Sequence, residues 1–153
     1  MKYLVDANVL SEATRQGPDS AVVDWLEAHE SELAIDAIVL GELAVGVVAL
    51  PKGRKRTTLE AWFGALVDTV ECLPWDAETS REWAQLVVHL RRQGRVMPLF
   101  DSMIAATART RGLIVVTRNV RDFEPAEVEL LNPVTEGGQA DRVHEPGSDY
   151  GTR

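Results

Sequence analysis

The sequence has little of several residue types, and each shortage removes a class of protein. Only one of its 153 residues is cysteine and three are histidine, so an internal disulfide is impossible and a zinc cluster is not indicated. No apolar run approaches the roughly 20 residues that span a bilayer, and the opening MKYLVDAN lacks the pattern of a secretory signal peptide. We therefore expect a cytoplasmic protein without a membrane segment.

Basic residues are also in short supply. Sixteen Lys and Arg stand against 24 Asp and Glu, which gives a formal net charge of -8. This balance argues against a protein that binds nucleic acid by broad basic coverage. It does not exclude an enzyme that grips phosphates through metal ions held by its own acids. These two cases differ in where the acids lie, so the positions of the acids matter more than their sum.

The length and the 45% apolar content predict one domain that buries about two thirds of its unfolded surface. Short apolar runs typical of buried strands occur at 2–5, 32–35, 70–75, 113–116 and 128–131. Helical patterns lie between them, at 21–29, 37–50, 59–68, 76–94 and 101–112. This alternation predicts an α/β sandwich with a mostly parallel sheet.

Two segments of this chain read as irregular. The stretch PKGRKRT at 51–57 is predicted to be a basic loop. Residues 135–153 are rich in Gly and charge and have almost nothing to bury, so we expect a disordered tail. The predicted domain is therefore 1–134.

Several acids fall where a parallel sheet binds its ligands, beyond the carboxyl ends of the strands. Asp6 follows the first strand directly, and Asp101 begins a later helix. The clearest buried strand, LIVV, is followed closely by Asn119 and Asp122. Glu42 differs, because it lies inside an apolar helix, where an unpaired buried carboxylate is costly.

Each of these acids also has a purely structural interpretation. Asp6 and Asp101 could be helix caps, Glu42 could lie half exposed on a helix edge, and Asp122 could belong to a turn. Two carboxylates about 5 Å apart, however, repel by on the order of 3 kcal/mol at an effective dielectric of 20, so a cluster must take up protons or bind a cation. All-oxygen ligands favour a hard ion such as Mg²⁺ or Mn²⁺ over zinc. Together the acids predict a metal site.

Four stretches carry a more specific signal, and a fifth closes the domain. They are LVDANVLSE (4–12), AIVLGELAVGV (37–47), FDSMIAATA (100–108), VVTRNVRDF (115–123) and the closing LLNP (130–133). In order and rough spacing they resemble the motifs of PIN-domain nucleases of the VapC toxin type, including the FitB-like branch. The resemblance implies a PIN-like three-layer sandwich with helices on both faces of the sheet, and a ribonuclease that depends on Mg²⁺, for which Mn²⁺ can substitute.

The resemblance also implies roles for matching residues. Asp6, Glu42, Asp101 and Asp122 would be the catalytic acids, with Asp6 and Asp101 as direct metal ligands. Many relatives have Asp where this chain has Asn119, whereas others share its N-x-x-D-F form. Either Asp122 therefore supplies the last carboxylate or Asn119 acts as a neutral ligand. A further polar residue of the first motif, Asn8, is expected to orient the first acid through a hydrogen bond.

Two further features bear on this resemblance. Ala7 stands where the family usually has Thr or Ser, which removes a hydroxyl near the first motif. The densest basic cluster follows the second motif and consists of Lys52, Arg54, Lys55 and Arg56. This cluster would suit contact with RNA phosphates, and it would equally suit a solvated loop.

Partners follow from the resemblance too. Toxins of this type dimerise and are held by a cognate VapB-like antitoxin, so we expect a homodimer, an antitoxin partner and an RNA substrate.

The alternative is a catalytically weak PIN module that acts through its antitoxin in DNA-binding autoregulation, which the joint presence of Asp6, Glu42 and Asp101 argues against. A receiver or phosphatase domain would want a Lys after a later strand, where Arg118 is the nearest match. A Rossmann nucleotide binder would need a G-x-G-x-x-G after a strand, which the sequence lacks.

Overall fold

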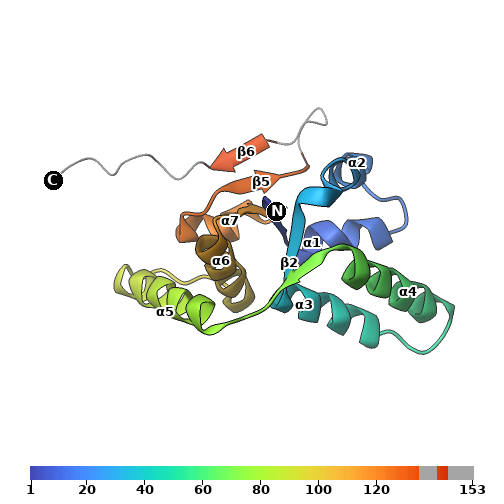
Figure 1. Cartoon of the computed structure of the whole chain (residues 1–153), viewed down its shortest axis with the longest axis horizontal. Helices are drawn as coiled ribbons and strands as arrows, with labels where there is room; N and C mark the ends of the chain where they lie inside the picture. The colour runs from blue at the N-terminus through green and yellow to red at the C-terminus, as the bar shows by residue number, and fades with distance from the viewer. Residues whose placement is uncertain (135–140, 145–153) are drawn as a thin grey trace.

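The structure is a computed structural model that describes residues 1–134 and the backbone of 141–144 (Figure 1). In this part of the chain one sheet has the strand order β3-β2-β1-β4-β5-β6. The strands are Tyr3–Val5 (β1), Leu33–Asp36 (β2), Glu71–Leu73 (β3), Ile114–Val116 (β4), Leu130–Asn132 (β5) and Asp141–His144 (β6). Strands β1 to β5 are parallel to their neighbours, and β6 runs antiparallel to β5.

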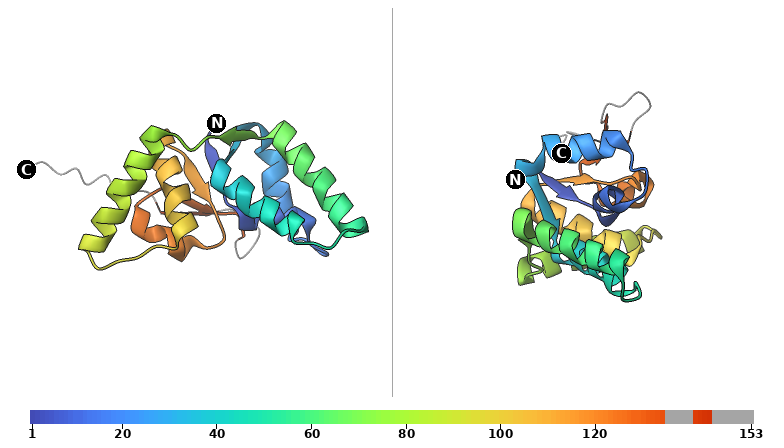
Figure 2. Two further views of the ribbon diagram at one scale, coloured as in Figure 1. Left: turned by 90° about the horizontal axis from the view of Figure 1, so that it is seen from below. Right: turned by 90° about the vertical axis from the view of Figure 1, so that its right-hand side faces the viewer.

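Helices cover both faces of this sheet. They are Ala7–Leu10 (α1), Ser20–Ala28 (α2), Ala37–Val48 (α3), Arg54–Thr69 (α4), Ala77–Arg92 (α5), Leu99–Arg111 (α6) and Val120–Phe123 (α7), with 3-10 turns at Ser11–Thr14 (η1), Glu30–Glu32 (η2) and Glu124–Ala126 (η3). Figure 2 shows α2 on one side of the sheet and α3 to α6 on the other. The predicted three-layer α/β architecture is confirmed. Within the described residues, no helix is both long enough and apolar enough to cross a bilayer.

The centre of the sheet is apolar because its strands are covered on both faces. Leu4 and Val5 of β1 and Val115 and Val116 of β4 are completely buried. These two strands pair in register, with Val5 opposite Val116. The next residue of each chain segment therefore emerges at the same edge of the sheet, and these residues are Asp6 and Thr117.

Two predicted boundaries were wrong. The basic stretch at 51–57 is a loop only up to Gly53, after which α4 begins at Arg54. Its first turns are supported by an ion pair of Arg56 with Glu60, 2.8 Å between Nε and Oε1, at the favourable i,i+4 spacing. Helix α6 begins at Leu99, two residues before Asp101, so Asp101 is not the helix cap.

The expected tail falls largely outside the described residues. Within it, the backbone of Asp141–His144 forms β6, antiparallel to β5. Such pairing uses main-chain groups that β5 would otherwise leave free at the edge of the sheet, so it requires no apolar side chains. The domain boundary at 134 stays a prediction.

Candidate active site

Asp6 is held in place at the end of β1 by two hydrogen bonds. The side chain is almost fully buried. Its Oδ1 accepts the backbone N–H of Ala7 at 2.8 Å, so Asp6 is indeed the cap of α1. Its Oδ2 accepts the hydroxyl of Thr117 at 2.8 Å. The cap and the second bond together fix both carboxylate oxygens at the edge of the sheet.

Thr117 is a functional residue that the sequence analysis missed. Its Oγ1 accepts the backbone N–H of Asn119 at 3.0 Å and the side-chain amide of Asn8 at 3.4 Å. Since both of these groups donate, the hydroxyl hydrogen is left to point at Asp6. Asn8 therefore acts on Asp6 through Thr117, one bond further away than expected. The available signal was the position of Thr117, directly after the clearest buried strand.

Glu42 lies in an environment that disfavours its charge. It projects from α3, and its Oε1 is buried without a hydrogen-bond partner. Burial raises the pKa of Glu42 to about 7, and the charges of Asp6, Asp101 and Asp36 add to the effect. This carboxyl group is consequently divided between its neutral and charged forms near neutral pH.

Asp101 and Asp122 belong to the same electrostatic group. Asp101 lies in the first turn of α6, and its pKa is raised to about 6 by burial and then by the charges of Asp6 and Asp122. The pKa of Asp6 is also raised, because burial outweighs its two hydrogen bonds, and Asp122 contributes again. The exposed Asp122 on α7 is therefore close enough to act on both. Each of the other three predicted acids is therefore within electrostatic range of Asp6.

A fifth acid, Asp36, was also missed. It ends β2, is 1% exposed, and caps α3 by accepting the N–H of Val39 at 2.8 Å. The pairing of Leu4 with Ala34 places Asp36 beside Asp6 when the register is continued by two residues. Burial and the charge of Asp6 raise the pKa of Asp36. The rule applied to the other strand ends would have found it, since it directly follows the predicted strand at 32–35.

We call Asp6, Asp36, Glu42, Asp101 and Asp122 the acid cluster, and the other predicted residues are less closely tied to it. Asn119 is exposed before α7, and within the described structure its hydrogen bonds use only the backbone: its N–H donates to Thr117 Oγ1 at 3.0 Å and its carbonyl accepts the N–H of Asp122 at 3.1 Å. Lys52, Arg54 and Lys55 are exposed and Arg56 is half-buried. Within the described residues none of the four pairs with an acid of the cluster. Further along, α4 borders a cavity of about 310 Å³ whose lining includes Leu59, Trp62 and, from the acid cluster, Glu42.

The donor set of the cluster suits a hard divalent cation. All its ligating atoms are carboxylate oxygens, and one of them, Glu42 Oε1, is buried without a partner. A bound cation would relieve the repulsion that raises these pKa values. Among the described residues, no three acids converge closely enough to form a ready-made metal site. The acids are thus near neighbours that a cation would have to draw together.

Comparison with known proteins assigns the family. Residues 3–127 match the model of the PIN domain. The chain is a PIN-domain protein. It is 36% identical to a VapC ribonuclease, Y4jK of Sinorhizobium fredii, over 85% of this chain and 96% of the relative. It is 33% identical to the toxin FitB of Neisseria gonorrhoeae, again over 85% and 96%.

A solved structure gives the same result for the fold. The crystal structure of FitAcB from Neisseria gonorrhoeae superposes with a TM-score of 0.81 at 32% identity, and the match covers 86% of this chain and 97% of that one. PIN ribonucleases depend on divalent metal ions, which agrees with the all-oxygen acid cluster. The predicted resemblance to the VapC and FitB branch of the PIN family is therefore confirmed.

Proposed function

We propose that this PIN-domain protein is the toxin of a toxin–antitoxin pair and acts as a metal-dependent ribonuclease that hydrolyses RNA phosphodiester bonds. The acid cluster carries the proposal: Asp6 at the end of β1 lies near Glu42, Asp101 and Asp122, which come from three other elements. The charge of Asp6 raises the pKa of Glu42 and of Asp101, and the charge of Asp122 raises the pKa of Asp6 and of Asp101. The names of the relatives, VapC ribonuclease and toxin FitB, support it.

The chain's residues have separate tasks in this reaction. Asp6 and Asp101 would hold the cation, for which we propose Mg²⁺, with Mn²⁺ as a substitute. When bound, such an ion lowers the pKa of water and neutralises charge on phosphate oxygens. Thr117 keeps Asp6 in its orientation. Glu42, whose pKa is about 7, can take up and release a proton at Oε1 near neutral pH.

Asp122 is the better candidate for the fourth acid. Its charge acts on both Asp6 and Asp101, whereas Asn119 makes its hydrogen bonds through the backbone alone within the described residues. We therefore assign the last carboxylate to Asp122 and a supporting position to Asn119.

The cations at the start of α4 are proposed contacts for the RNA backbone outside the acid cluster. They are Lys52 just before the helix, Arg54 and Lys55, together with the half-buried Arg56. Arg56 already pairs with Glu60, so we expect it to contribute least. Because the cavity beside α4 reaches Glu42, RNA held along this helix can approach the acids.

We further propose a cognate VapB-like antitoxin, a homodimer and a cytoplasmic location. Exposed apolar side chains support a protein partner: Val45 on α3 is 69% exposed, and Val96 and Leu99 at the other end of the molecule are 88% and 60% exposed. Val48, one turn from Val45, and Phe100, next to Leu99, are exposed as well. Grouped apolar side chains of this kind are typical of surfaces that a partner covers.

Cleavage of a structured RNA with and without Mg²⁺ or Mn²⁺ tests the proposed activity. We expect Asp6→Ala and Asp101→Ala to reduce the rate by about a thousandfold, because metal-ion stabilisation of the transition state is worth several kcal/mol. Asp24→Ala, which changes an exposed acid of α2, should cleave like the unchanged protein. Cleavage that persists in EDTA, or in both site variants, would refute the metal-dependent mechanism.

A further inference from the structure

A hollow lined mainly by polar side chains lies beside the acid cluster, around the turn between β4 and α7. Its volume is about 320 Å³, and its polar lining consists of Arg118, Asn119, Arg121, Asp122 and Asn132. We call it the turn pocket. Asp122 belongs to both the pocket and the acid cluster, because its charge acts on Asp6 and Asp101. A ligand in the turn pocket would therefore lie next to the cleavage centre.

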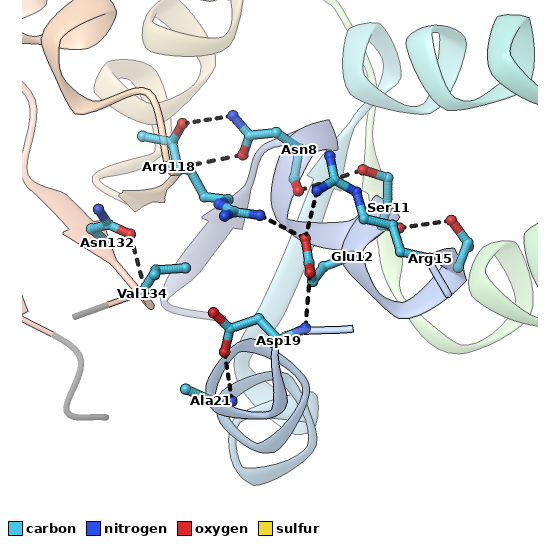
Figure 3. A network of polar contacts seen from close by, with 11 residues as sticks. Asn8, Ser11, Glu12, Arg15, Asp19, Ala21, Arg118, Asn132 and Val134 are labelled. Carbon is cyan, nitrogen blue, oxygen red and sulfur yellow. Dashed lines mark hydrogen bonds and ion pairs between the residues drawn. The ribbon is translucent and has the colours of Figure 1, made fainter. Parts of the chain in front are cut away.

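Arg118 is held firmly in the wall of this pocket. Its Nη1 donates to Oε2 of Glu12 at 2.6 Å, and Glu12 is only 4% exposed (Figure 3). The same carboxylate also pairs with Arg15 at 3.5 Å and accepts the backbone N–H of Asp19 at 2.9 Å. The backbone N–H of Arg118 donates to Oδ1 of Asn8 at 3.3 Å. A guanidinium anchored in this way needs little ordering when it binds a ligand.

Most of the polar side-chain groups in the turn pocket that have no hydrogen-bond partner within the described residues are hydrogen-bond donors. One third of the Arg118 side chain is exposed, and its Nε and Nη2 have no hydrogen bond within the described residues. Asn132 uses Oδ1 to accept the N–H of Val134 at 3.0 Å, which leaves its NH₂ group unused (Figure 3). Arg121 is exposed and has no ion pair in the described structure. Two guanidinium groups and an amide NH₂ are suited to bind an anion with several oxygens.

We propose that the turn pocket binds a phosphate group of the RNA strand next to the bond that is cleaved, with Arg118 and Arg121 as its cations and Asn132 as a neutral donor. This inference rests on the proposed ribonuclease function. The position favours RNA over an acidic protein segment, because successive phosphates of one strand can reach the acid cluster and the adjoining turn pocket together. In a protein of net charge -8, such a local pair of cations would also fix the direction of the strand.

The test measures binding of a single-stranded oligouridylate in EDTA, so that it does not depend on cleavage. Arg121→Gln should weaken binding about tenfold and lower the slope of log K against log salt by roughly 0.7, the value for one lost contact with a single strand. Arg92→Gln, which changes an exposed arginine at the end of α5, is the matched control and should change neither quantity.

Arg118 requires a double variant, because removing it alone leaves the buried Glu12 without its main partner. Glu12→Gln with Arg118→Gln keeps neutral groups in contact there. We expect a further loss of about tenfold in binding relative to Glu12→Gln alone. Thermal unfolding of both variants checks that the loss is not one of folding.

A set of oligouridylates with a single neutral methylphosphonate linkage, moved along the strand, identifies the phosphate. At one linkage position we expect Arg121→Gln to cost no further affinity, because the charge that the arginine contacts is already gone. If Arg121→Gln and the double variant bind RNA like their references, or lose affinity equally for every linkage position, the proposal is wrong.

Weakened binding of the antitoxin with unchanged RNA binding would overturn it in favour of a protein contact. Failure of the unchanged protein to cleave RNA would count against the proposed function. The binding results would still test the turn pocket, because they are measured in EDTA and do not depend on cleavage.

Discussion

Glu12 and Glu42 both have buried carboxylate oxygens, but only Glu12 has hydrogen-bond partners for them. Glu12 is almost fully buried, and both of its oxygens are bonded, to Arg118, Arg15 and the backbone of Asp19. Glu42 has a buried oxygen with no partner, and the charged groups that shift its pKa are all acids. A buried carboxylate with its donors supplied is part of the scaffold, whereas one left without them is available for a ligand.

The strongest test of this contrast replaces the unpartnered carboxylate. We expect Glu42→Gln to lower the rate of RNA cleavage at least about a hundredfold, in the range of lost acid–base groups. The same variant should be at least as stable as the unchanged protein, because it removes a charge that the site disfavours. Initial cleavage rates and thermal unfolding are the two measurements. A variant that loses stability together with activity would place Glu42 in the scaffold.

The opposite outcome is expected at Glu12. Glu12→Ala leaves the backbone N–H of Asp19 and the guanidinium of Arg118 without their acceptor, and we expect the free energy of unfolding to fall by about 3 kcal/mol. Urea unfolding measures this loss. Glu27→Ala on α2 is the control, since Glu27 is exposed, and it should change the value by less than about 0.5 kcal/mol. Equal stability of the two variants would mean that the Glu12 contacts contribute nothing.

Thr117 lies between these two cases, because its hydroxyl is buried, fully bonded and directed at the site. Thr117→Val keeps the shape and removes the bond to Asp6 Oδ2. Loss of a group that orients a metal ligand costs tenfold to a hundredfold in metal affinity in other proteins, so we expect about a tenfold higher Mg²⁺ requirement. Thr117→Ser should restore it. A metal requirement that is the same in all three proteins would exclude an orienting role.

The smallest effect is the dependence of stability on pH. Burial and neighbouring acids raise the pKa of Glu42 from its ordinary 4.5 to about 7 in the folded protein, and that of Asp101 from 3.8 to about 6. The folded protein therefore holds more protons than the unfolded chain between these values, and its stability falls as pH rises from 4.5 to 7. Both groups are partly exposed, so we expect about 1 kcal/mol, measured by urea unfolding in EDTA. Glu42→Gln should flatten the curve, and a rise in stability over this range would contradict the assignment.

Much of the fold could be predicted because its strands are short apolar runs in a chain that alternates regularly. The acids Asp6, Glu42, Asp101 and Asp122 could be predicted because strand ends and the family motifs mark them. Asp36 was within reach of the same rule and was overlooked. The pairing of Glu12 with Arg118 could not be predicted, since 106 residues separate them and no local pattern in either segment indicates the other.

The position of β1 in the middle of the sheet has a consequence for synthesis of the protein. The N–H of Asp6 donates to the carbonyl of Val116 at 2.9 Å, and its carboxylate accepts the hydroxyl of Thr117, 111 residues further along the chain. Contacts between segments so far apart close late in folding. A ribosome that releases the chain before β4 therefore yields a fragment without an assembled centre. The proposed nuclease therefore stays inactive until the ribosome has made β4.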